Sequence, residues 1–198
     1  MVTGSGVRGP GRRPGAPDTR GQILSAARTA FADKGFERTT VRGVAAAAGV
    51  APGLVHHFFG AKEDLFLAAL AVPFDPRVVL APVADGPPDD LGRGLARTFV
   101  DIWEDERRRE SLLALLRGAM TSPPVATMLR EGFMPMAVGA LGRAVAAPDP
   151  AARIQLALAQ LLGMATLRYA VRVEPLASMP PDEVVNRLAP ALQLHLRG

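Results

Sequence analysis

Apolar residues recur at helical spacing along most of the chain, beginning near residue 18. The first predicted helix is marked by apolar positions three and four residues apart: Ile23, Leu24, Ala27, Ala30 and Phe31. Thr19 and Gln22 stand three residues apart before this run, which is the spacing of a capping box. Gly35, followed by Phe36, is typical of a helix end.

Three shorter helices are predicted after Gly35. Thr39 and Thr40 can cap a helix over residues 41–48, which ends at a glycine. Pro52 suits the first turn of a helix over residues 52–58, because its missing N–H needs no partner there. A fourth helix follows over about 62–71. Two short helices joined by a glycine turn, after a longer one, indicate a helix-turn-helix.

The remainder of the chain is also predicted to be helical. Five prolines in residues 73–90 predict a linker or irregular loop. Helical patterns then resume, separated by breaks rich in proline and glycine, over residues 91–110, 111–121, 125–145, 151–172 and 181–196. We find no alternating strand pattern and no internal repeat, so the predicted fold is all-α.

Charge and composition divide the chain into three parts. Residues 1–17 are rich in Gly, Pro and Arg, which predicts a disordered basic arm. We expect residues 18–64 to form the helix-turn-helix and residues 65–198 a second, larger domain. The first 62 residues carry nine Lys/Arg and three acids, a net charge of +6, whereas the rest carries −2. A basic head on a nearly neutral body favours a polyanionic partner such as DNA.

Several function classes are excluded or disfavoured by composition. The chain has no cysteine, which excludes disulfides, thiol catalysis and cysteine-based zinc sites. No apolar signal-peptide core follows the basic N-terminus. The longest apolar stretch, 154–173, contains Gln155, Gln160, Arg168 and Arg172, which argues against a membrane span. We therefore expect a cytoplasmic protein with no membrane partner.

Residues 19–70 resemble the tetracycline-repressor (TetR) family of regulators. The resemblance rests on the following segments and positions: Thr19 to Leu24, Ala26-Ala27, Phe31, Gly35-Phe36, Thr39 to Val41, Ala45, Ala48 to Val50, and Phe59 to Phe66. Further along the chain, Gln160 to Gly163, Arg168-Tyr169 and Glu174 to Ser178 resemble an actinobacterial-type ligand domain of that family. Residues 65–198 would then form an effector-binding and dimerisation domain.

The resemblance implies roles for residues of the helix-turn-helix. Residues 51–58 would form the recognition helix in the major groove, while Thr40 and Lys62 would contact phosphates. The implied DNA-binding set is Thr40, Arg42, Ala51, Pro52, Gly53, Leu54, His56, His57 and Lys62. Ala51 stands where the family usually has Ser, Thr or Asp, so this helix lacks a side-chain cap.

The second domain contains candidates for an effector cavity. Methionine and aromatic residues suit an adaptable apolar pocket, although core packing explains each of them individually. The candidate set is Phe99, Trp103, Arg117, Met120, Phe133, Gln160, Met164, Arg168 and Tyr169. Arg168 and Tyr169 are the polar candidates within a long apolar helix. Arg168 has an alternative role, pairing with an acid at a subunit interface.

The last two helices are apolar on more than one face, which requires burial on more than one side. The resemblance implies that two chains pair these helices into a four-helix bundle. It further implies a homodimer that binds an operator of inverted symmetry. A small-molecule effector would release this repressor from DNA.

The sequence disfavours the alternative functions of an enzyme and of a structural scaffold. An enzyme would need a nucleophile and base, paired carboxylates or a cofactor loop, none of which is evident. We expect no cofactor and no metal, because adjacent histidines such as His56 and His57 point about 100° apart on a helix. A helical scaffold with an inactive DNA head is a further alternative. Repression and activation, the identity of the effector, the operator sequence and DNA contact by the N-terminal arginines stay open.

Overall fold

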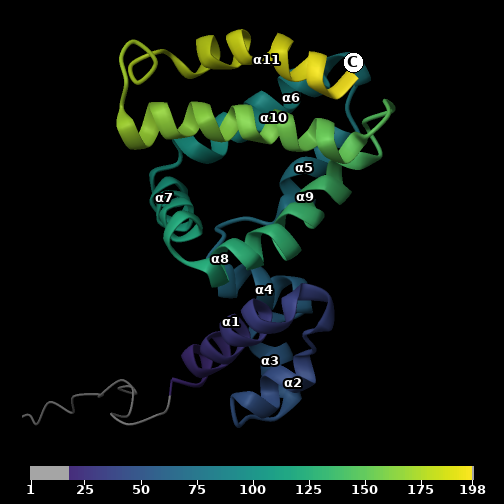
Figure 1. Ribbon diagram of the computed structural model, residues 1–198, viewed down its shortest axis with the longest axis vertical. Coiled ribbons are helices and arrows are strands. Elements are labelled where there is room, and N and C mark those ends of the chain that lie inside the picture. Colours follow the sequence, from purple (N-terminus) through teal and green to yellow (C-terminus); the bar gives the residue numbers. More distant parts are fainter. Residues whose placement is uncertain (1–17, 198) are drawn as a thin grey trace, which may run out of the picture.

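The computed structural model describes residues 18–197, which form a small helical head and a larger helical body (Figure 1). Within these residues there is no strand, so the all-α prediction is confirmed. The predicted basic arm, residues 1–17, lies outside the described range.

The head consists of four helices close to those predicted. They are α1 (Thr19–Arg38), α2 (Val41–Ala47), α3 (Pro52–Phe59) and α4 (Lys62–Leu70). The start of α1 differs in one detail, because Asp18 is its cap. The Asp18 carboxylate accepts a hydrogen bond from the Gly21 N–H at 2.9 Å, so Thr19 is the first helical residue.

The head is held together by an aromatic core that joins α1 to α4. Phe31 and Phe66 are almost fully buried, with ring centroids 5.1 Å apart in an edge-to-face arrangement. Such a pair contributes about 0.5–1.5 kcal/mol beyond its buried area. The predicted break at Gly35 is confirmed, since its φ of 74° lies outside the helical region. One further turn then carries the chain to Arg38.

The body consists of seven α-helices, one 3-10 turn and two π-helical turns. The α-helices are α5 (Pro76–Ala84), α6 (Leu91–Glu104), α7 (Glu106–Thr121), α8 (Pro123–Met128), α9 (Met134–Gly142), α10 (Pro150–Ala165) and α11 (Pro181–Arg197). A 3-10 turn, η1 (Pro88–Asp90), precedes α6, and the π-helical turns η2 (Leu129–Phe133) and η3 (Thr166–Val171) follow α8 and α10. Helices α10 and α11 lie side by side at the end farthest from α2 and α3 (Figure 1).

The prediction of a linker over residues 73–90 is wrong, because most of that segment is α5 and η1. Asp75 caps α5 by accepting a hydrogen bond from the Arg77 N–H at 2.8 Å. Pro76 occupies the first helical position, where proline is favoured. Leu80 and Val83 are buried on one face, and this burial offsets the hydrogen bond lost at Pro82 inside the helix.

The predicted break between residues 110 and 111 is also misplaced. The chain turns at Asp105, whose φ of −68° and ψ of 116° are extended. Its carboxylate accepts from the Arg108 N–H at 2.9 Å and so begins α7 at Glu106. The charged run 104–110 therefore contains the cap of α7, Asp105. Among so many charged residues, the sequence did not single out this aspartate as a cap.

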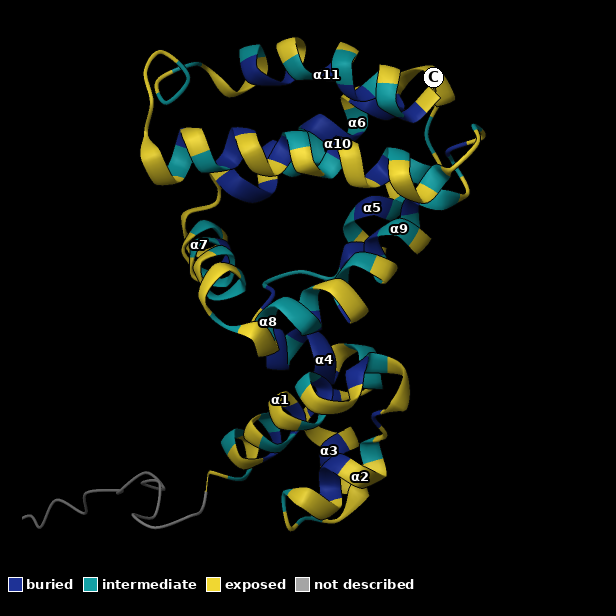
Figure 2. Cartoon of the chain, in the orientation of Figure 1, coloured by how far each residue is buried: buried dark blue, intermediate teal, exposed yellow. Residues whose placement is uncertain are grey.

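Helix α10 and the turn after it present an apolar face to the surface. Together, Pro150–Val171 is long and apolar enough to cross a bilayer, and 33% of its most apolar window is buried. The bent pair Glu106–Thr121 and Pro123–Gly142 passes the same test jointly. Leu156, Leu167 and Val171 are 46–61% exposed, and Figure 2 shows exposed residues along α10.

Candidate functional site

Helix α3 is anchored by two residues and exposes the rest. Val55 and Phe59 are buried in the head, whereas every other residue of α3 is exposed. Leu54 and Phe58 are 36% and 40% exposed, so this face offers apolar as well as polar contact surface. Ala51 provides no side-chain cap, as expected from its type. The exposed face thus contains Pro52, Gly53, Leu54, His56, His57 and Phe58.

The two predicted phosphate-contacting residues, at the starts of α2 and α4, are accessible to different degrees. Thr40 is exposed, and its hydroxyl oxygen accepts from the Gly43 N–H at 3.0 Å, which caps α2. The hydroxyl hydrogen is left to donate outward. Lys62 is half-buried, and its ammonium donates to the Glu37 carbonyl at 3.2 Å. It also lies 4.4 Å from the ring centroid of Phe36.

The two histidines of α3 have different surroundings. His56 Nδ1 lies 2.9 Å from the Gly60 carbonyl oxygen. A carbonyl only accepts, so this hydrogen bond requires the proton on Nδ1 and leaves Nε2 as an acceptor in the neutral ring. His57 packs edge-on against Phe58 at 5.5 Å between ring centroids. No cluster of three His, Cys, Asp or Glu suited to a metal occurs within residues 18–197.

Two further arginines lie close to this surface. Arg20, exposed on α1, is positioned over the Phe59 ring at 5.1 Å, next to α3. Arg42 is exposed on the first turn of α2. Arg20 was not among the predicted site residues, and its position became evident only from the packing of α1 on α3.

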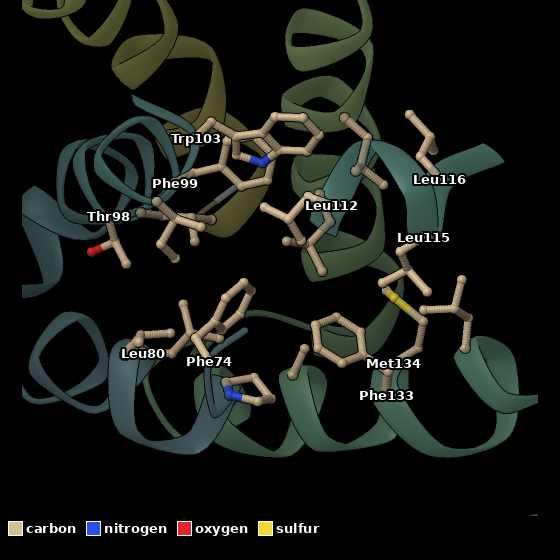
Figure 3. Close-up of a pocket in the computed structure, with 18 residues that line it drawn as sticks. Phe74, Leu80, Thr98, Phe99, Trp103, Leu112, Leu115, Leu116, Phe133 and Met134 are labelled. Carbon is tan, nitrogen blue, oxygen red and sulfur yellow. The ribbon is translucent and has the colours of Figure 1, made fainter. Parts of the chain in front are cut away.

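The body encloses a cavity of about 190 Å³. Its wall is formed by α5, α6, α7, η2, α9 and α10, together with the segment before α5 (Figure 3). The surface is almost wholly apolar, and the lining residues are Phe74, Pro76, Val79, Leu80, Leu95, Thr98, Phe99, Ile102, Trp103, Leu112, Leu115, Leu116, Leu129, Phe133, Met134, Ala137, Leu158 and Leu162.

Three of the nine predicted effector residues line this cavity, namely Phe99, Trp103 and Phe133. The other six lie elsewhere. Met164 is buried in the body core, and Met120 is 74% exposed. Arg117 is exposed on α7, and Gln160 on α10 has a buried Oε1 with no hydrogen-bond partner.

Arg168 and Tyr169 belong to a polar cluster beside the cavity rather than to its wall. Arg168 is 6% exposed, and its guanidinium pairs with the Glu104 carboxylate at 2.9 Å within the same chain. The Tyr169 hydroxyl donates to the same carboxylate at 2.9 Å. Burial, followed by this hydrogen bond, raises the pKa of Tyr169 to about 12. Both side chains thus have partners that sequence reasoning did not find.

An aromatic stack links the polar cluster to the cavity. Phe99 stacks on Trp103 at 5.8 Å, and Trp103 stacks on Tyr169 at 5.5 Å between ring centroids. Arg109 from α7 lies over Tyr169 at 5.7 Å and donates to the Trp103 carbonyl. The first two rings line the cavity and the third does not.

The cavity floor is shared with the core of the head. Phe74 and Phe133 meet edge-to-face at 6.3 Å, and both line the cavity while packing against the head cluster. In the same π-helical turn, Gly132 faces α4 so closely that a Cβ would lie 2.3 Å from Cζ of Phe66. The turn η2 therefore has one face on the cavity and the other on the head.

Comparison with known proteins extends over both parts of the chain. Residues 23–69 match the family "Bacterial regulatory proteins, tetR family", and residues 89–196 match "Tetracyclin repressor-like, C-terminal domain". The chain is 47% identical over 51 residues to the HTH-type transcriptional repressor AcnR of Corynebacterium glutamicum. That match covers 26% of this chain and 27% of AcnR, so it concerns about a quarter of each protein.

Longer matches have lower identity or concern solved structures. The HTH-type transcriptional regulator UidR of Escherichia coli is 34% identical over 136 residues, covering 60% of this chain and 61% of UidR. A TetR-family regulator from Streptomyces coelicolor is 36% identical with a TM-score of 0.47, covering 94% and 98% of the two chains. Another regulator from Streptomyces coelicolor, 22% identical, has a TM-score of 0.51 and covers 92% and 100%, which indicates a similar fold.

Proposed function

This chain belongs to the TetR family of bacterial regulatory proteins, and we propose that it is a transcriptional repressor that a small molecule releases from its operator. One observation carries the proposal most directly. Helix α3 exposes a continuous face at the tip of a helix-turn-helix while Val55 and Phe59 fix it to the head. The names of the relatives AcnR and UidR support a role in transcription.

DNA recognition follows from the exposure of the head residues. The outer face of α3 enters the major groove, where Leu54 offers contact to a thymine methyl and His56 Nε2 accepts from a base amine. Thr40 donates its hydroxyl to a phosphate, and Arg42 and Lys62 provide positive charge beside it. Lys62 exchanges its bond to the Glu37 carbonyl for a phosphate oxygen.

Two copies pair through α10 and α11, which form the end of the body opposite the head. An apolar helix face of this kind is stable in water only when covered. The exposed face of α10 consists mostly of small or apolar residues, including Ala152, Leu156, Ala159 and Leu162. On α11, Leu194 is 68% exposed. A twofold pair places two α3 helices on one face of the duplex, with half-sites about 34–36 Å apart or at a bent-DNA equivalent. The operator then has inverted symmetry.

The cavity of about 190 Å³ is the effector site, and η2 with α4 transmits occupancy to the head. A ligand displaces Phe74 or Phe133, and Phe133 lies in the same turn as Gly132, which packs against Phe66 of α4. Release from DNA follows when the ligand-bound state sets the two α3 helices at a spacing that no longer fits the grooves.

Residues 18–64 act as the DNA-binding domain and residues 65–198 as the effector and dimerisation domain. This role places the protein in the cytoplasm with the chromosome and requires no enzymatic activity. An inactive scaffold is the competing function, and sequence-specific DNA binding distinguishes the two.

The decisive experiment selects DNA from a random pool with the purified protein and sequences what is bound. We expect one inverted repeat, bound more weakly as salt increases. Two histidine variants sharpen the result. His57→Ala on α3 changes the selected half-site, whereas His195→Ala on α11 does not. Recovery of unrelated sequences by the unmodified protein would favour the scaffold.

A further inference from the structure

We propose that the cavity takes a neutral, hydrocarbon-like ligand of about one aromatic ring and rejects molecules that carry a charge. The proposal concerns the chemical class of the effector, and only the effect of the ligand on DNA rests on the proposed repressor function. It is drawn from the wall of the cavity, the polar groups next to it and its size.

The wall offers a ligand almost no polar surface. Thr98 and Trp103 bear the only side-chain nitrogen or oxygen atoms among the lining residues. Figure 3 shows the Thr98 hydroxyl turned away from the cavity. The Trp103 indole is a neutral donor and cannot compensate a charge. Carboxylate, phosphate or ammonium groups would lose their hydration without gaining a countercharge, since none of the lining residues carries one.

The charged cluster that the aromatic stack joins to the cavity is already satisfied by its own contacts. Arg168 is held by Glu104 at 2.9 Å, and Glu104 also accepts from Tyr169 at 2.9 Å. Arg109 is fixed over the Tyr169 ring and by the Trp103 carbonyl. The stack of Trp103 on Tyr169, 5.5 Å between centroids, keeps this cluster off the cavity wall. A charged ligand would have to break these contacts to be recognised.

The size of the cavity sets the scale of the ligand. Engineered apolar cavities of about 150 Å³ in other proteins stay dry and bind benzene. At about 190 Å³, this cavity has room for a substituted single ring. Phe74 and Phe133 on the floor and Phe99 on α6 provide aromatic edges and faces for such a ring.

The test compares three 4-ethylphenyl probes of similar size, 1,4-diethylbenzene, 4-ethylbenzoate and 4-ethylbenzylammonium, of which the first and third have the same shape. Trp103 is the only tryptophan of the chain and lines the cavity, so its fluorescence reports occupancy. We expect saturable binding of the neutral probe to the full chain without DNA. The two charged probes should bind at least about 100-fold more weakly, because the wall offers no countercharge to either ion.

Variants locate the site and test the absence of polar recognition. Leu116→Phe on α7 fills the cavity and should weaken the neutral probe more than about tenfold. Leu113→Phe, three residues earlier and outside the wall, should leave binding unchanged. Thr98→Val should also bind normally. Thermal unfolding of each variant checks that a loss of binding is not a loss of folding.

The outcomes separate this proposal from the repressor function. Equal binding of a charged probe, or a more than tenfold loss in Thr98→Val, would overturn the proposed ligand class. If the neutral probe alone binds and Leu116→Phe abolishes binding, the class stands whether or not any DNA is selected. Absence of a selected operator in that case would reject only the repressor function.

Discussion

At the scale of single residues, the proposed DNA interface separates groups that read bases from groups that hold phosphates. His56 lies on α3 and Lys62 at the start of α4. The Nε2 of the neutral His56 ring is an open acceptor, whereas the Lys62 ammonium already donates to the Glu37 carbonyl. Phosphate contacts position the protein on DNA, whereas base contacts determine which sequence is bound. Replacing the two side chains should therefore affect DNA binding in different ways.

We predict that Lys62→Ala weakens binding to every DNA sequence and lowers the salt dependence by about one phosphate contact. His56→Ala should instead cost about 1–3 kcal/mol at one base pair and little elsewhere. Binding curves over a range of salt, with operators mutated one position at a time, measure both effects. Normal binding of the Lys62 variant at all salt concentrations would remove this residue from the interface.

Tyr169 offers a second prediction at this scale, since it is the only tyrosine of the chain. Burial and the hydrogen bond to Glu104 raise its pKa from 10.0 to about 12 in the folded state. A raised pKa contributes stability below pH 10 that is lost as the pH rises towards 12. Tyrosinate absorbance should therefore titrate near 12 in native protein and near 10 in denaturant. Titration near 10 in both states would contradict the Glu104 contact.

At the scale of elements, η2 packs directly against the head. Gly132 is buried, and the space where a Cβ would stand is filled by the Phe66 ring of α4. Phe133, the next residue, lines the cavity. One π-helical turn thus packs against two different surfaces through adjacent residues, and π-helical turns often occur at functional sites.

Gly132→Ala should destabilise the protein by about 1–3 kcal/mol, because the added methyl overlaps the Phe66 ring. Gly139→Ala in α9 is the matched control, since nothing lies within 4 Å of its added Cβ. That exchange should stabilise the helix by about 0.5–1 kcal/mol. Urea unfolding of both variants measures the difference, and equal stability would show that α4 yields easily to η2.

The same elements show how far sequence reasoning extends. Periodic apolar positions and the break at Gly35 located the head helices to within a few residues. Helix α5 was missed because Pro76 and Pro82 look like loop residues until Asp75 and the buried Leu80 are seen in place. Spacing alone cannot show which partners a side chain finds across the fold.

The candidate site was predicted unevenly for a related reason. Exposed residues of a short helix follow directly from its register, so the outer face of α3 could be identified in advance. A cavity wall has no such signature. Leu112, Leu115 and Leu158 line it with side chains identical to those that fill the solid core, and only three-dimensional packing separates the two.

At the scale of the whole molecule, the head and the apolar face of α10 lie at opposite ends of the body (Figure 2). Pairing through α10 would leave both heads free to contact one duplex. Specificity then depends on the dimer, because a single α3 reads only one half-site.

We predict that Leu156→Glu on α10 converts the protein to a monomer and weakens operator binding. Leu156 is 56% exposed, so the change removes no core contact within one chain. Val78→Glu on α5, at a position 67% exposed, is the control and should stay dimeric. Sedimentation at micromolar concentration separates the two states. A purely monomeric unmodified protein would count against the proposed pairing.

Leu162 belongs both to the cavity wall and to the exposed face of α10 that we propose as the dimer interface, where it is 39% exposed. Covering that residue by a second copy would close part of the wall from outside. Ligand affinity would then obey mass action in protein concentration: a probe should bind more weakly to dilute, dissociated chains than to concentrated ones. If a second chain completes the cavity wall, the apparent ligand affinity of each chain reports the fraction of the protein that is dimeric.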